Sequence, residues 1–369
     1  MNMNFFAPVN VITGKNCVKN NASAFADFGK RCLIVTGKSS AKKSGALDDV
    51  ISALDLAGTE YAIFDDIEQN PSYTSCKKAA DVAKEFGAEF IIGIGGGSPL
   101  DAAKAIAVLA TCSDTSAKAL YSMKWDAPPL PVIAVGTTAG TGSEVTHIAI
   151  ITDEDGLKKS LRDPAIYPAI SFGDPSYTMT LSPEFTRSTA LDAICHCIES
   201  YFNKEANDIS QTYALRGIEI LLEMLDKTAN CDTVSLTYEE REKLYCASLY
   251  GGFAISVTGT AFPHVMGYFL SEQYGISHGN ACACYIEEFI NHNVSVAPDE
   301  AEKMFKRLGT NKESMVEAIK KNIPEIDVKL TEEKISELAP RYENNKSLKK
   351  CYGTVDGDFA VSLLKKIFI

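Results

Sequence analysis

Residues 89–98 form the stretch Glu89-Phe-Ile-Ile-Gly-Ile-Gly-Gly-Gly-Ser98, in which an apolar segment runs directly into a cluster of glycines. Pro99 and Leu100 follow, and Asp101-Ala-Ala-Lys104 then opens a helical pattern. The apolar segment predicts a strand, and glycine allows backbone N–H groups to approach a phosphate without a Cβ in the way. The N-terminus of the helix adds its partial positive charge. The spacing departs from the usual G-x-G-x-x-G pattern, so a tight turn without a ligand is the alternative.

A second loop of small polar residues follows the apolar segment Pro131–Val135 and has the sequence Thr137-Thr-Ala-Gly-Thr-Gly-Ser-Glu144. Its threonine hydroxyls and glycines form a polar lining of low bulk, which suits a nucleotide diphosphate and an amide-bearing ring. A flexible loop rich in hydroxyls is the alternative. Two such loops after neighbouring strands favour a dinucleotide, because ligands of open α/β sheets bind beyond the carboxyl ends of the strands.

The first half of the chain alternates predicted strands with predicted helices. The helical patterns include Ser44–Ala57 and Tyr73–Phe86. The predicted strands are Cys32–Thr36, Tyr61–Phe64, Phe90–Ile94, Val132–Val135 and His147–Thr152. Because this alternation is typical of parallel βαβ units, we expect an α/β dinucleotide-binding domain with a parallel sheet over residues 1–181.

The second half, residues 182–369, shows almost no strand pattern and is expected to be an all-α domain. Helix starts are indicated at Ser182-Pro183-Glu184, at Thr237-Tyr-Glu-Glu240 and at Thr331-Glu-Glu333. Each places an N-cap hydroxyl before acidic residues, which stabilise the first turn of a helix. No linker rich in proline or glycine separates the halves, so we expect the two domains to pack closely.

The composition is that of an ordinary globular chain. Among 369 residues, 36 Lys and Arg against 48 Asp and Glu give a formal net charge of −12, which argues against nucleic-acid and anionic-membrane partners. The apolar runs fall short of the roughly 18 residues of a membrane helix, and Met1 to Asn10 does not resemble a signal peptide. The eleven cysteines form no C-x-x-C pair, so we expect reduced thiols in a cytoplasmic protein.

Histidines are few, and three of the five lie in segments with the spacing of metal sites. Asp192 and His196 are spaced i,i+4 in the helix that starts near Pro183 and therefore point from one face. A carboxylate and an imidazole one turn apart are a reasonable half-site for a metal. An ion pair or a buried structural histidine is the alternative for this pair. His147 and His292 are expected to be structural or surface residues.

His264 and His278 would lie about 21 Å apart in one unbroken helix at ~1.5 Å per residue. Gly275 and Gly279 flank His278, so we expect the helix to break and return, which would bring both histidines to the face that carries the first pair. One aspartate and three histidines form a mixed oxygen and nitrogen set suited to Fe²⁺ or Zn²⁺, and such a metal can act as a Lewis acid on a substrate oxygen.

These motifs together resemble the iron-containing, group III alcohol dehydrogenase family, whose fold is like that of dehydroquinate synthase and glycerol dehydrogenase. The resemblance covers nearly the whole chain. The motifs that carry it are Phe5-Phe-Ala-Pro8, Val11-Ile-Thr-Gly14, Gly95-Gly-Gly-Ser-Pro-Leu-Asp-Ala-Ala-Lys104, Thr137-Thr-Ala-Gly-Thr-Gly-Ser-Glu-Val-Thr146, Asp192-Ala-Ile-Cys-His-Cys-Ile-Glu199 and His278-Gly-Asn-Ala281. It implies a two-domain enzyme, with its active site in the cleft between the domains, that interconverts a small alcohol and an aldehyde or ketone with NAD(P).

The resemblance also implies which residues form the site. It assigns the metal, Fe²⁺ or Zn²⁺, to Asp192, His196, His264 and His278, which would act in catalysis through it. The candidate cofactor-binding residues are Gly37, Ser39, Ser40, Asn70, Gly95, Gly96, Gly97, Ser98, Asp101, Thr137, Thr138, Thr141, Thr146 and Lys159, with Lys158 as the alternative to the last. The metal would hold the substrate oxygen and lower the pKa of the alcohol, and hydride would pass between the substrate and the nicotinamide.

Two positions depart from the family pattern. Gly37 stands where many relatives have an aspartate that accepts the adenosine ribose hydroxyl, and Lys38-Ser-Ser-Ala-Lys-Lys43 follows it. Without that carboxylate a 2′-phosphate is not repelled, so we predict a preference for NADP(H) over NAD(H); a basic solvated loop without selectivity is the alternative. Tyr268 stands where relatives often have a histidine, and we expect it to shape the pocket or to hydrogen-bond a substrate.

Two other functions are weighed against the dehydrogenase. A lyase of the dehydroquinate synthase kind would share the fold and cofactor without net redox chemistry, but the chain lacks an obvious cluster of basic residues for a phosphorylated, carboxylated substrate. A catalytically silent metal or nucleotide sensor is disfavoured by the intact candidate ligands and by the presence of both loops. We expect a homo-oligomer, in the simplest case a dimer, and a small alcohol or aldehyde as substrate.

Overall fold

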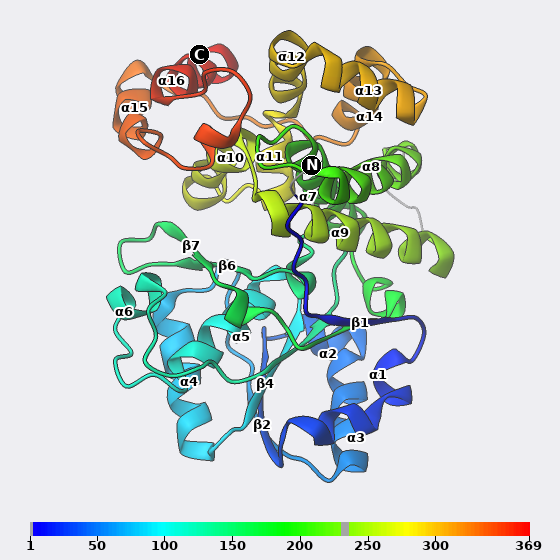
Figure 1. Ribbon diagram of the computed structural model, residues 1–369, viewed down its shortest axis with the longest axis vertical. Helices are drawn as coiled ribbons and strands as arrows, with labels where there is room; N and C mark the ends of the chain where they lie inside the picture. Colours follow the sequence, from blue (N-terminus) through cyan, green and yellow to red (C-terminus); the bar gives the residue numbers. More distant parts are fainter. Residues whose placement is uncertain (1–2, 230–235) are drawn as a thin grey trace. The chain divides into compact units, whose positions relative to one another are not determined.

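The computed structural model describes residues 3–229 and 236–369, which divide into two compact units (Figure 1). The sheet unit comprises Phe6–Ser182 and Ser235–Gly252, and the helical unit comprises Met1–Phe5, Pro183–Val234 and Phe253–Ile369. Relative to the expected domains 1–181 and 182–369, residues 3–5 and 236–252 group with the other unit.

Within the described residues, the strands lie in the sheet unit. They are β1 (Asn10–Thr13), β2 (Arg31–Thr36), β3 (Glu60–Phe64), β4 (Phe90–Gly95), β5 (Val132–Gly136), β6 (Ile148–Thr152), β7 (Lys158–Arg162) and β8 (Ile170–Gly173). Its α-helices are α1 (Cys17–Asn20), α2 (Ser40–Ser44), α3 (Ala46–Ala57), α4 (Tyr73–Phe86), α5 (Gly97–Leu109) and α6 (Ala117–Ser122). Helix α9 (Tyr238–Thr258) begins in this unit.

A parallel sheet organises this unit, with the strand order β1-β8-β5-β4-β2-β3. The predicted α/β fold with a parallel sheet is therefore confirmed. One expectation was wrong: the predicted strand His147–Thr152 lies outside this sheet, because β6 pairs antiparallel with β7. Only residues 153–157 join the two strands, and so short a connection permits only an antiparallel hairpin. Strands β1, β7 and β8 were not predicted.

Helices cover both faces of the parallel sheet, because side chains alternate between the faces along each strand. Leu33 and Ile91 belong to a hydrophobic cluster that includes residues of α4 and α5. Ile34 and Ile92, one position further along the same strands, belong to a second cluster that includes residues of α3. This two-sided burial explains why the strands are near-continuous apolar runs.

The helical unit consists of packed helices, as predicted. They are α7 (Pro183–Tyr201), α8 (Asp208–Thr228), α10 (Phe262–Gln273), α11 (His278–Ala283), α12 (Ile286–Val296), α13 (Pro298–Leu308), α14 (Lys312–Lys320), α15 (Glu332–Leu338) and α16 (Gly357–Phe368), together with the end of α9. Within residues 3–229 and 236–369, every helix is too short or too polar to cross a membrane.

Local sequence determines where several of these helices begin and end. Helix α7 starts at Pro183, as predicted, and Thr331 caps α15 by accepting from Lys334 N at 3.1 Å. The predicted break between the two histidine segments is present: α10 ends at Gln273, Gly275 has φ +67°, and the next helix begins three residues later. A positive φ favours glycine, which explains why the chain turns at this residue.

Candidate functional site

The two predicted cofactor loops follow neighbouring strands of the parallel sheet. Strand β4 pairs with β2 on one side and with β5 on the other. The order of the strands reverses between β2 and β4. The chain runs from β2 outward to β3 on one side, and then continues with β4 and β5 on the other side of β2. Ligands of open parallel sheets bind at the carboxyl ends of strands where the order reverses. Gly37, the glycine loop (residues 95–98) and the threonine loop (residues 137–146) all follow the carboxyl ends of these three strands.

The glycine loop packs directly on the threonine loop. A Cβ on Gly96 would lie 3.0 Å from Thr138 Cγ2, and a Cβ on Gly97 would lie 2.9 Å from Thr141 Cγ2. Glycine is therefore required for the contact between the loops, in addition to any approach of a phosphate. Thr137 Oγ1 is buried without a hydrogen-bond partner among the described residues, and buried hydroxyls are normally paired. A ligand would supply the missing partner.

Asp101 and Thr146, two further cofactor candidates, lie in a buried network around Lys104. Lys104 Nζ donates to Ser143 O at 2.7 Å and to Thr146 Oγ1 at 3.3 Å. Asp101 accepts from Ser143 Oγ at 2.5 Å and from Ile150 N at 2.8 Å. Burial lowers the pKa of the Lys104 ammonium to about 8. These contacts are with protein groups, so they hold the threonine loop against α5.

Four further cofactor candidates follow the strands next to this reversal of strand order. Gly37, Ser39 and Ser40 come after β2, and Asn70 comes after β3. Asn70 N donates to Ser98 Oγ at 3.2 Å, which joins the loop after β3 to the glycine loop. Ser39 is the N-cap residue of α2, and Ser40 is its first residue. A Cβ on Gly37 would lie 3.1 Å from a backbone carbonyl oxygen, so a larger residue fits there with a small adjustment.

Lys38, in the loop after β2, and Lys42, in α2, have carboxylate partners that the sequence analysis did not consider. Lys38 Nζ lies 2.9 Å from Asp66 Oδ1, and Lys42 Nζ lies 2.8 Å from Asp65 Oδ2. These pairs are exposed, and exposed ion pairs contribute little to stability. The carboxylates nevertheless offset the positive charge that was expected to attract a 2′-phosphate.

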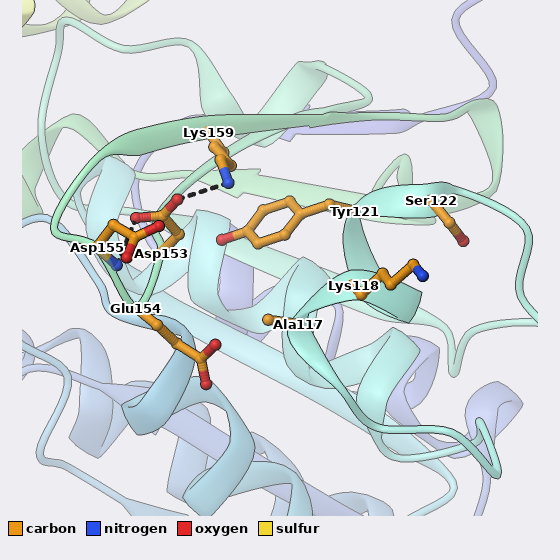
Figure 2. A pocket seen from close by; sticks show the side chains of 8 residues that line it. All are labelled: Ala117, Lys118, Tyr121, Ser122, Asp153, Glu154, Asp155 and Lys159. Atoms are coloured by element: carbon orange, nitrogen blue, oxygen red, sulfur yellow. Dashed lines mark hydrogen bonds and ion pairs between the residues drawn. The ribbon is translucent and has the colours of Figure 1, made fainter.

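Lys159 lies at a surface pocket of about 470 Å³ (Figure 2). Lys159 Nζ is 2.6 Å from Asp153 Oδ2 and 5.4 Å from the centre of the Tyr121 ring. The other lining residues are Ala117, Lys118, Ser122, Glu154 and Asp155. The lining contains no residue of the glycine or threonine loop, so the structure does not group Lys159 with those loops.

Three imidazoles in the helical unit face one carboxylate oxygen. Asp192 Oδ1 lies 3.3 Å from His264 Nε2, 3.7 Å from His278 Nε2 and 3.8 Å from His196 Nε2. The side chains of Asp192, His196 and His264 are at most 6% exposed, whereas that of His278 is 31% exposed. The four predicted metal ligands, from α7, α10 and α11, are thus brought together, and the site keeps a partly open side at His278.

These residues fit a divalent metal ion. Asp192 Oδ1 and His264 Nε2 are buried, and within the described part of the chain neither has a hydrogen-bond partner of acceptable geometry. Unpaired buried polar atoms are costly, and a coordinated cation would satisfy them. Carboxylate and imidazole donors suit Fe²⁺ and Zn²⁺.

The electrostatics of the cluster favour an ionised Asp192. Burial by itself would raise the pKa of this carboxyl, but the neighbouring His196, His278 and His264 together outweigh burial and hold its pKa well below the usual range. A ligand carboxylate must be deprotonated, so Asp192 is already in the form that binds a cation.

Glu199 orients His264 and was not among the predicted site residues. Glu199 Oε1 accepts from His264 Nδ1 at 2.5 Å, and its Oε2 accepts from Ala261 N at 2.6 Å. The carboxylate is fully buried. A hydrogen bond to Nδ1 fixes the tautomer of a histidine and leaves Nε2 free to bind a metal. Its i+7 spacing from Asp192 on α7 was the sequence feature that could have identified this role.

Small residues let α11 approach its neighbours closely. A Cβ on Gly279 would overlap Ser188 O and would lie 2.9 Å from Asp192 N, both on α7. A Cβ on Gly267 of α10 would lie 3.0 Å from the backbone of Ala281. The glycine that follows His278 therefore allows this histidine to reach the aspartate.

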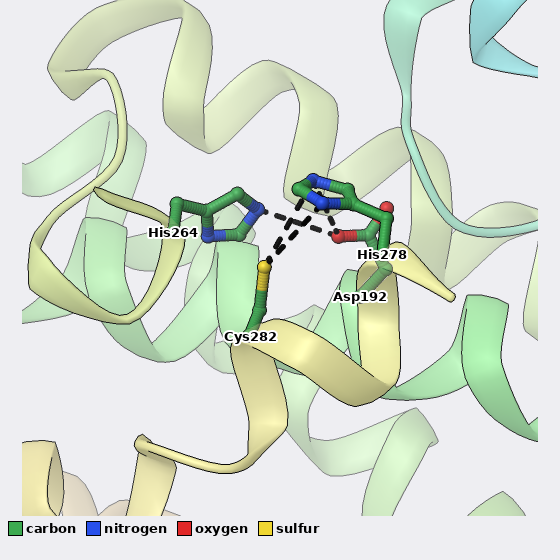
Figure 3. A group of neighbouring side chains, drawn as sticks. All are labelled: Asp192, His264, His278 and Cys282. Atoms are coloured by element: carbon green, nitrogen blue, oxygen red, sulfur yellow. Dashed lines mark hydrogen bonds and ion pairs between the residues drawn. The ribbon is translucent and has the colours of Figure 1, made fainter. Parts of the chain in front are cut away.

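Tyr268 and Cys282 complete the surroundings of His278. The Tyr268 ring stacks on the imidazole with centroids 5.8 Å apart and an angle of 14° between the planes, and burial raises the pKa of its phenol. Asp192, His264, His278 and Cys282 form a group whose ligand atoms all lie within 4.8 Å of one another (Figure 3). Cys282 was expected to be only a buried thiol, although its i+4 spacing from His278 was visible in the sequence.

Comparison with known proteins identifies the family. Residues 8–175 match the family model described as iron-containing alcohol dehydrogenase, and residues 186–356 match the C-terminal model of the same family. The chain belongs to the iron-containing alcohol dehydrogenase family. This result confirms the resemblance seen in the sequence. It also confirms that the protein is an oxidoreductase acting on CH–OH groups, and it favours this function over the lyase alternative.

Similar proteins include dehydrogenases and a reductase. The 1,3-propanediol dehydrogenase of Klebsiella pneumoniae is 30% identical over 84% of this chain and 78% of its own length. The NADPH-dependent butanol dehydrogenase of Clostridium saccharobutylicum is 29% identical over 89% and 84%. The structure of sulfoacetaldehyde reductase from Bifidobacterium kashiwanohense in complex with NAD⁺ is 25% identical, has a TM-score of 0.88 and covers 100% of this chain and 99% of that one.

Proposed function

We propose that the chain is a metal-dependent, NAD(P)-linked alcohol dehydrogenase and aldehyde reductase whose metal is held by Asp192, His196, His264 and His278. The observation that carries this proposal is the convergence of three Nε2 atoms on Asp192 Oδ1 within 3.8 Å. When bound, the metal supplies a Lewis acid for the oxygen of an alcohol or carbonyl substrate. The cofactor supplies the hydride chemistry.

The side chains of the helical unit have separate roles in this proposal. Asp192 contributes the negative charge of the ligand set, and the three imidazoles fix its geometry. Glu199 holds His264 in the productive tautomer through the 2.5 Å hydrogen bond. The phenol of Tyr268, stacked on His278, shapes the substrate pocket and is placed to hydrogen-bond a substrate. Burial raises the pKa of this phenol further above its usual value.

The loops of the sheet unit bind the dinucleotide in this proposal. The glycine loop and the N-terminus of α5 receive the pyrophosphate, because backbone N–H groups and the helix dipole favour an anion. Thr137, with its unpaired buried hydroxyl, and its neighbours Thr138 and Thr141 line the nicotinamide end. Asp101 and Lys104 contribute indirectly, because they hold the threonine loop against α5.

The proposed metal site is tested with His196→Ala. Loss of one imidazole should lower metal content and abolish turnover, while circular dichroism and the fluorescence of the single tryptophan, Trp125, show a folded sheet unit. His292→Ala is the matched control, because His292 Nε2 contacts Tyr352 O at 2.8 Å and takes no part in the metal cluster. Full activity of His196→Ala, or unchanged metal content, would refute the ligand assignment.

The proposed cofactor is NADP(H) in preference to NAD(H). The absence of a side chain at Gly37 and the hydroxyls of Ser39 and Ser40 at the start of α2 favour a 2′-phosphate. The pairing of Lys38 and Lys42 with aspartates limits the effect, so we expect a preference of about tenfold, which requires ~1.4 kcal/mol.

The cofactor preference is tested by kcat/KM with NADPH and NADH. Gly37→Asp should shift the preference toward NADH, since it restores a carboxylate that repels phosphate. Gly37→Ala is the control for the steric effect, because a Cβ there already lies 3.1 Å from Ile67 O. A wild-type preference for NADH would refute the proposed preference and leave the dehydrogenase assignment intact.

A cytoplasmic homo-oligomer is proposed on separate grounds. Most cysteines are buried, and all those that the structure describes are free thiols, which suits a reducing compartment.

The edge strands β1 and β3 each have one side that pairs with no further strand in the described residues, and such edges are able to pair with another chain. Sedimentation velocity would distinguish a dimer from a monomer.

A further inference from the structure

Cys282 points into the same space as the candidate metal ligands (Figure 3). It lies on α11, one helical turn after His278, and is completely buried. Its Sγ is 3.7 Å from Nδ1 and 3.9 Å from Nε2 of His278. The thiol is therefore at the metal cluster and is not merely part of the hydrophobic packing.

The distances around Cys282 are those of atoms that share one ion. Metal–nitrogen and metal–sulfur bonds of about 2.0–2.3 Å place two donors on one ion about 3–4.5 Å apart. Cys282 Sγ lies within this range of both ring nitrogens of His278. The ligand atoms of Asp192, His264, His278 and Cys282 all lie within 4.8 Å of one another, at most about 0.3 Å beyond the range. His196 is not in this group, although its Nε2 is 3.8 Å from Asp192 Oδ1. The site thus offers five donors, and Cys282 lies as close to Asp192, His264 and His278 as donors on a shared ion do.

Two buried atoms of this group independently indicate a ligand. Asp192 Oδ1 and His264 Nε2 belong to side chains that are at most 5% exposed, and neither has a properly oriented hydrogen-bond partner among the described residues. Both atoms face the space that the thiol enters. A cation there would be bound by the carboxylate, the imidazoles and the sulfur together.

Sulfur changes the metal preference of such a site. Carboxylate and imidazole donors accept Fe²⁺ and Zn²⁺ alike, whereas a thiolate is a soft ligand that favours Zn²⁺. We propose that Cys282 is a ligand of the metal and shifts the choice of metal in this chain from Fe²⁺ toward Zn²⁺. On coordination, the S–H bond breaks, its proton passes to solvent and the sulfur electron pair forms the bond to the ion. This inference rests on the proposed metal site.

Cobalt(II) added to the metal-free protein tests the inference. Ligand-field bands in the visible range show that Co²⁺ occupies the site, and an intense sulfur-to-cobalt charge-transfer band in the near ultraviolet appears only if a thiolate is bound. We expect both kinds of band in the wild type. In Cys282→Ser and in Cys282→Ala the charge-transfer band should disappear while the ligand-field bands remain.

Cys284→Ser is the matched control. Cys284 lies two residues further along, and its Sγ donates to Asn280 O at 3.3 Å; this variant should keep the charge-transfer band. Competition between Zn²⁺ and Fe²⁺ should shift at least tenfold toward Fe²⁺ in Cys282→Ser and not in Cys284→Ser. Ligand-field bands without a charge-transfer band in the wild type would overturn the role of Cys282 alone. Failure of the wild type to bind Co²⁺ at all would overturn the proposed metal site as well.

Discussion

At the scale of single residues, the neighbours of a side chain indicate its role better than the residue type does. Three histidines surround one carboxylate oxygen of Asp192, whereas His147 packs beside Tyr167 with ring centroids 4.9 Å apart. Among the groups near the cluster, Glu199 has a defined task, because both of its oxygens accept hydrogen bonds.

Glu199→Gln should weaken metal binding. The amide replaces one of the two acceptor oxygens by a donor, so either His264 Nδ1 or Ala261 N loses its partner. Changes to groups that orient a metal ligand typically cost about 10–100-fold in affinity, and we expect a loss of this size for Zn²⁺ in competition with a coloured chelator. Glu205→Gln is the control, since Glu205 pairs with Lys350 at 2.7 Å on the surface. Equal affinities for the two variants would contradict the role of Glu199.

His147 should make the sheet unit less stable in acid. Burial, helped by the nearby Arg162, lowers the pKa of this imidazole to about 4. The unfolded chain, with a pKa near 6.5, therefore binds more protons between these values, and stability falls as the pH drops from about 6.5 to 4. Because the ring is only partly buried, we expect a loss of about 1 kcal/mol between pH 7 and pH 5.

The measurement for His147 is urea unfolding followed by Trp125 fluorescence at both pH values. Trp125 packs against a hydrophobic cluster of the sheet unit, so its signal reports on that unit. His147→Phe keeps a ring beside Tyr167 and should reduce the difference between the two pH values by this amount. An unchanged pH dependence in the variant would show that other groups cause it.

At the scale of elements, glycines determine how closely helices and loops approach each other. The contact of α11 with α7 passes through Gly279, and the contact between the two cofactor loops passes through Gly96 and Gly97. Gly279 follows the candidate metal ligand His278, and Gly96 and Gly97 precede the candidate cofactor-binding residue Ser98. The motifs that resemble the family are thus also the places where these elements make close contact: backbone against backbone at Gly279, and backbone against threonine side chains at Gly96 and Gly97.

Gly279→Ala should displace α11 and its histidine. The added methyl group would overlap Ser188 O, and relief of such crowding costs roughly 1–3 kcal/mol of stability. We also expect metal affinity to fall at least tenfold, measured by isothermal titration calorimetry with Zn²⁺. Gly275→Ala is the control, because a Cβ there meets nothing within 4 Å although φ is +67°. It should lose stability through backbone strain and still bind Zn²⁺ normally; equal losses of affinity would contradict the argument.

At the scale of the whole molecule, the sequence predicted the class of fold and the clustering of the candidate metal ligands. Apolar strands alternating with helices indicated the parallel sheet, and Gly275 indicated the break that brings His264 and His278 together. Strands β7 and β8 were missed because Lys158–Arg162 is polar and Ile170–Gly173 is only four residues long. Periodicity does not identify such short or polar strands.

The rest of the site depends on contacts between residues that are distant in sequence. Glu199 contacts His264 across 65 positions, and Asp66 contacts Lys38 across a strand and two helices. No local pattern specifies either contact, since each arises only when separate elements pack. The same reason explains why the sequence did not indicate that the part of α9 around Tyr245, which occupies the space beside Gly136 and Gly173, groups with the sheet unit.

The central claim, a metal-dependent NAD(P)-linked dehydrogenase, is tested most directly by the rate of NAD(P)H oxidation with a panel of small aldehydes. The protein is assayed after chelation and dialysis, and again after reloading with Fe²⁺ or Zn²⁺. The account predicts that at least one aldehyde supports net NAD(P)H oxidation, that chelation lowers the rate at least 100-fold, and that one equivalent of metal restores it. Turnover that survives complete removal of the metal, or a metal-loaded protein that oxidises no NAD(P)H with any aldehyde of the panel, would contradict it.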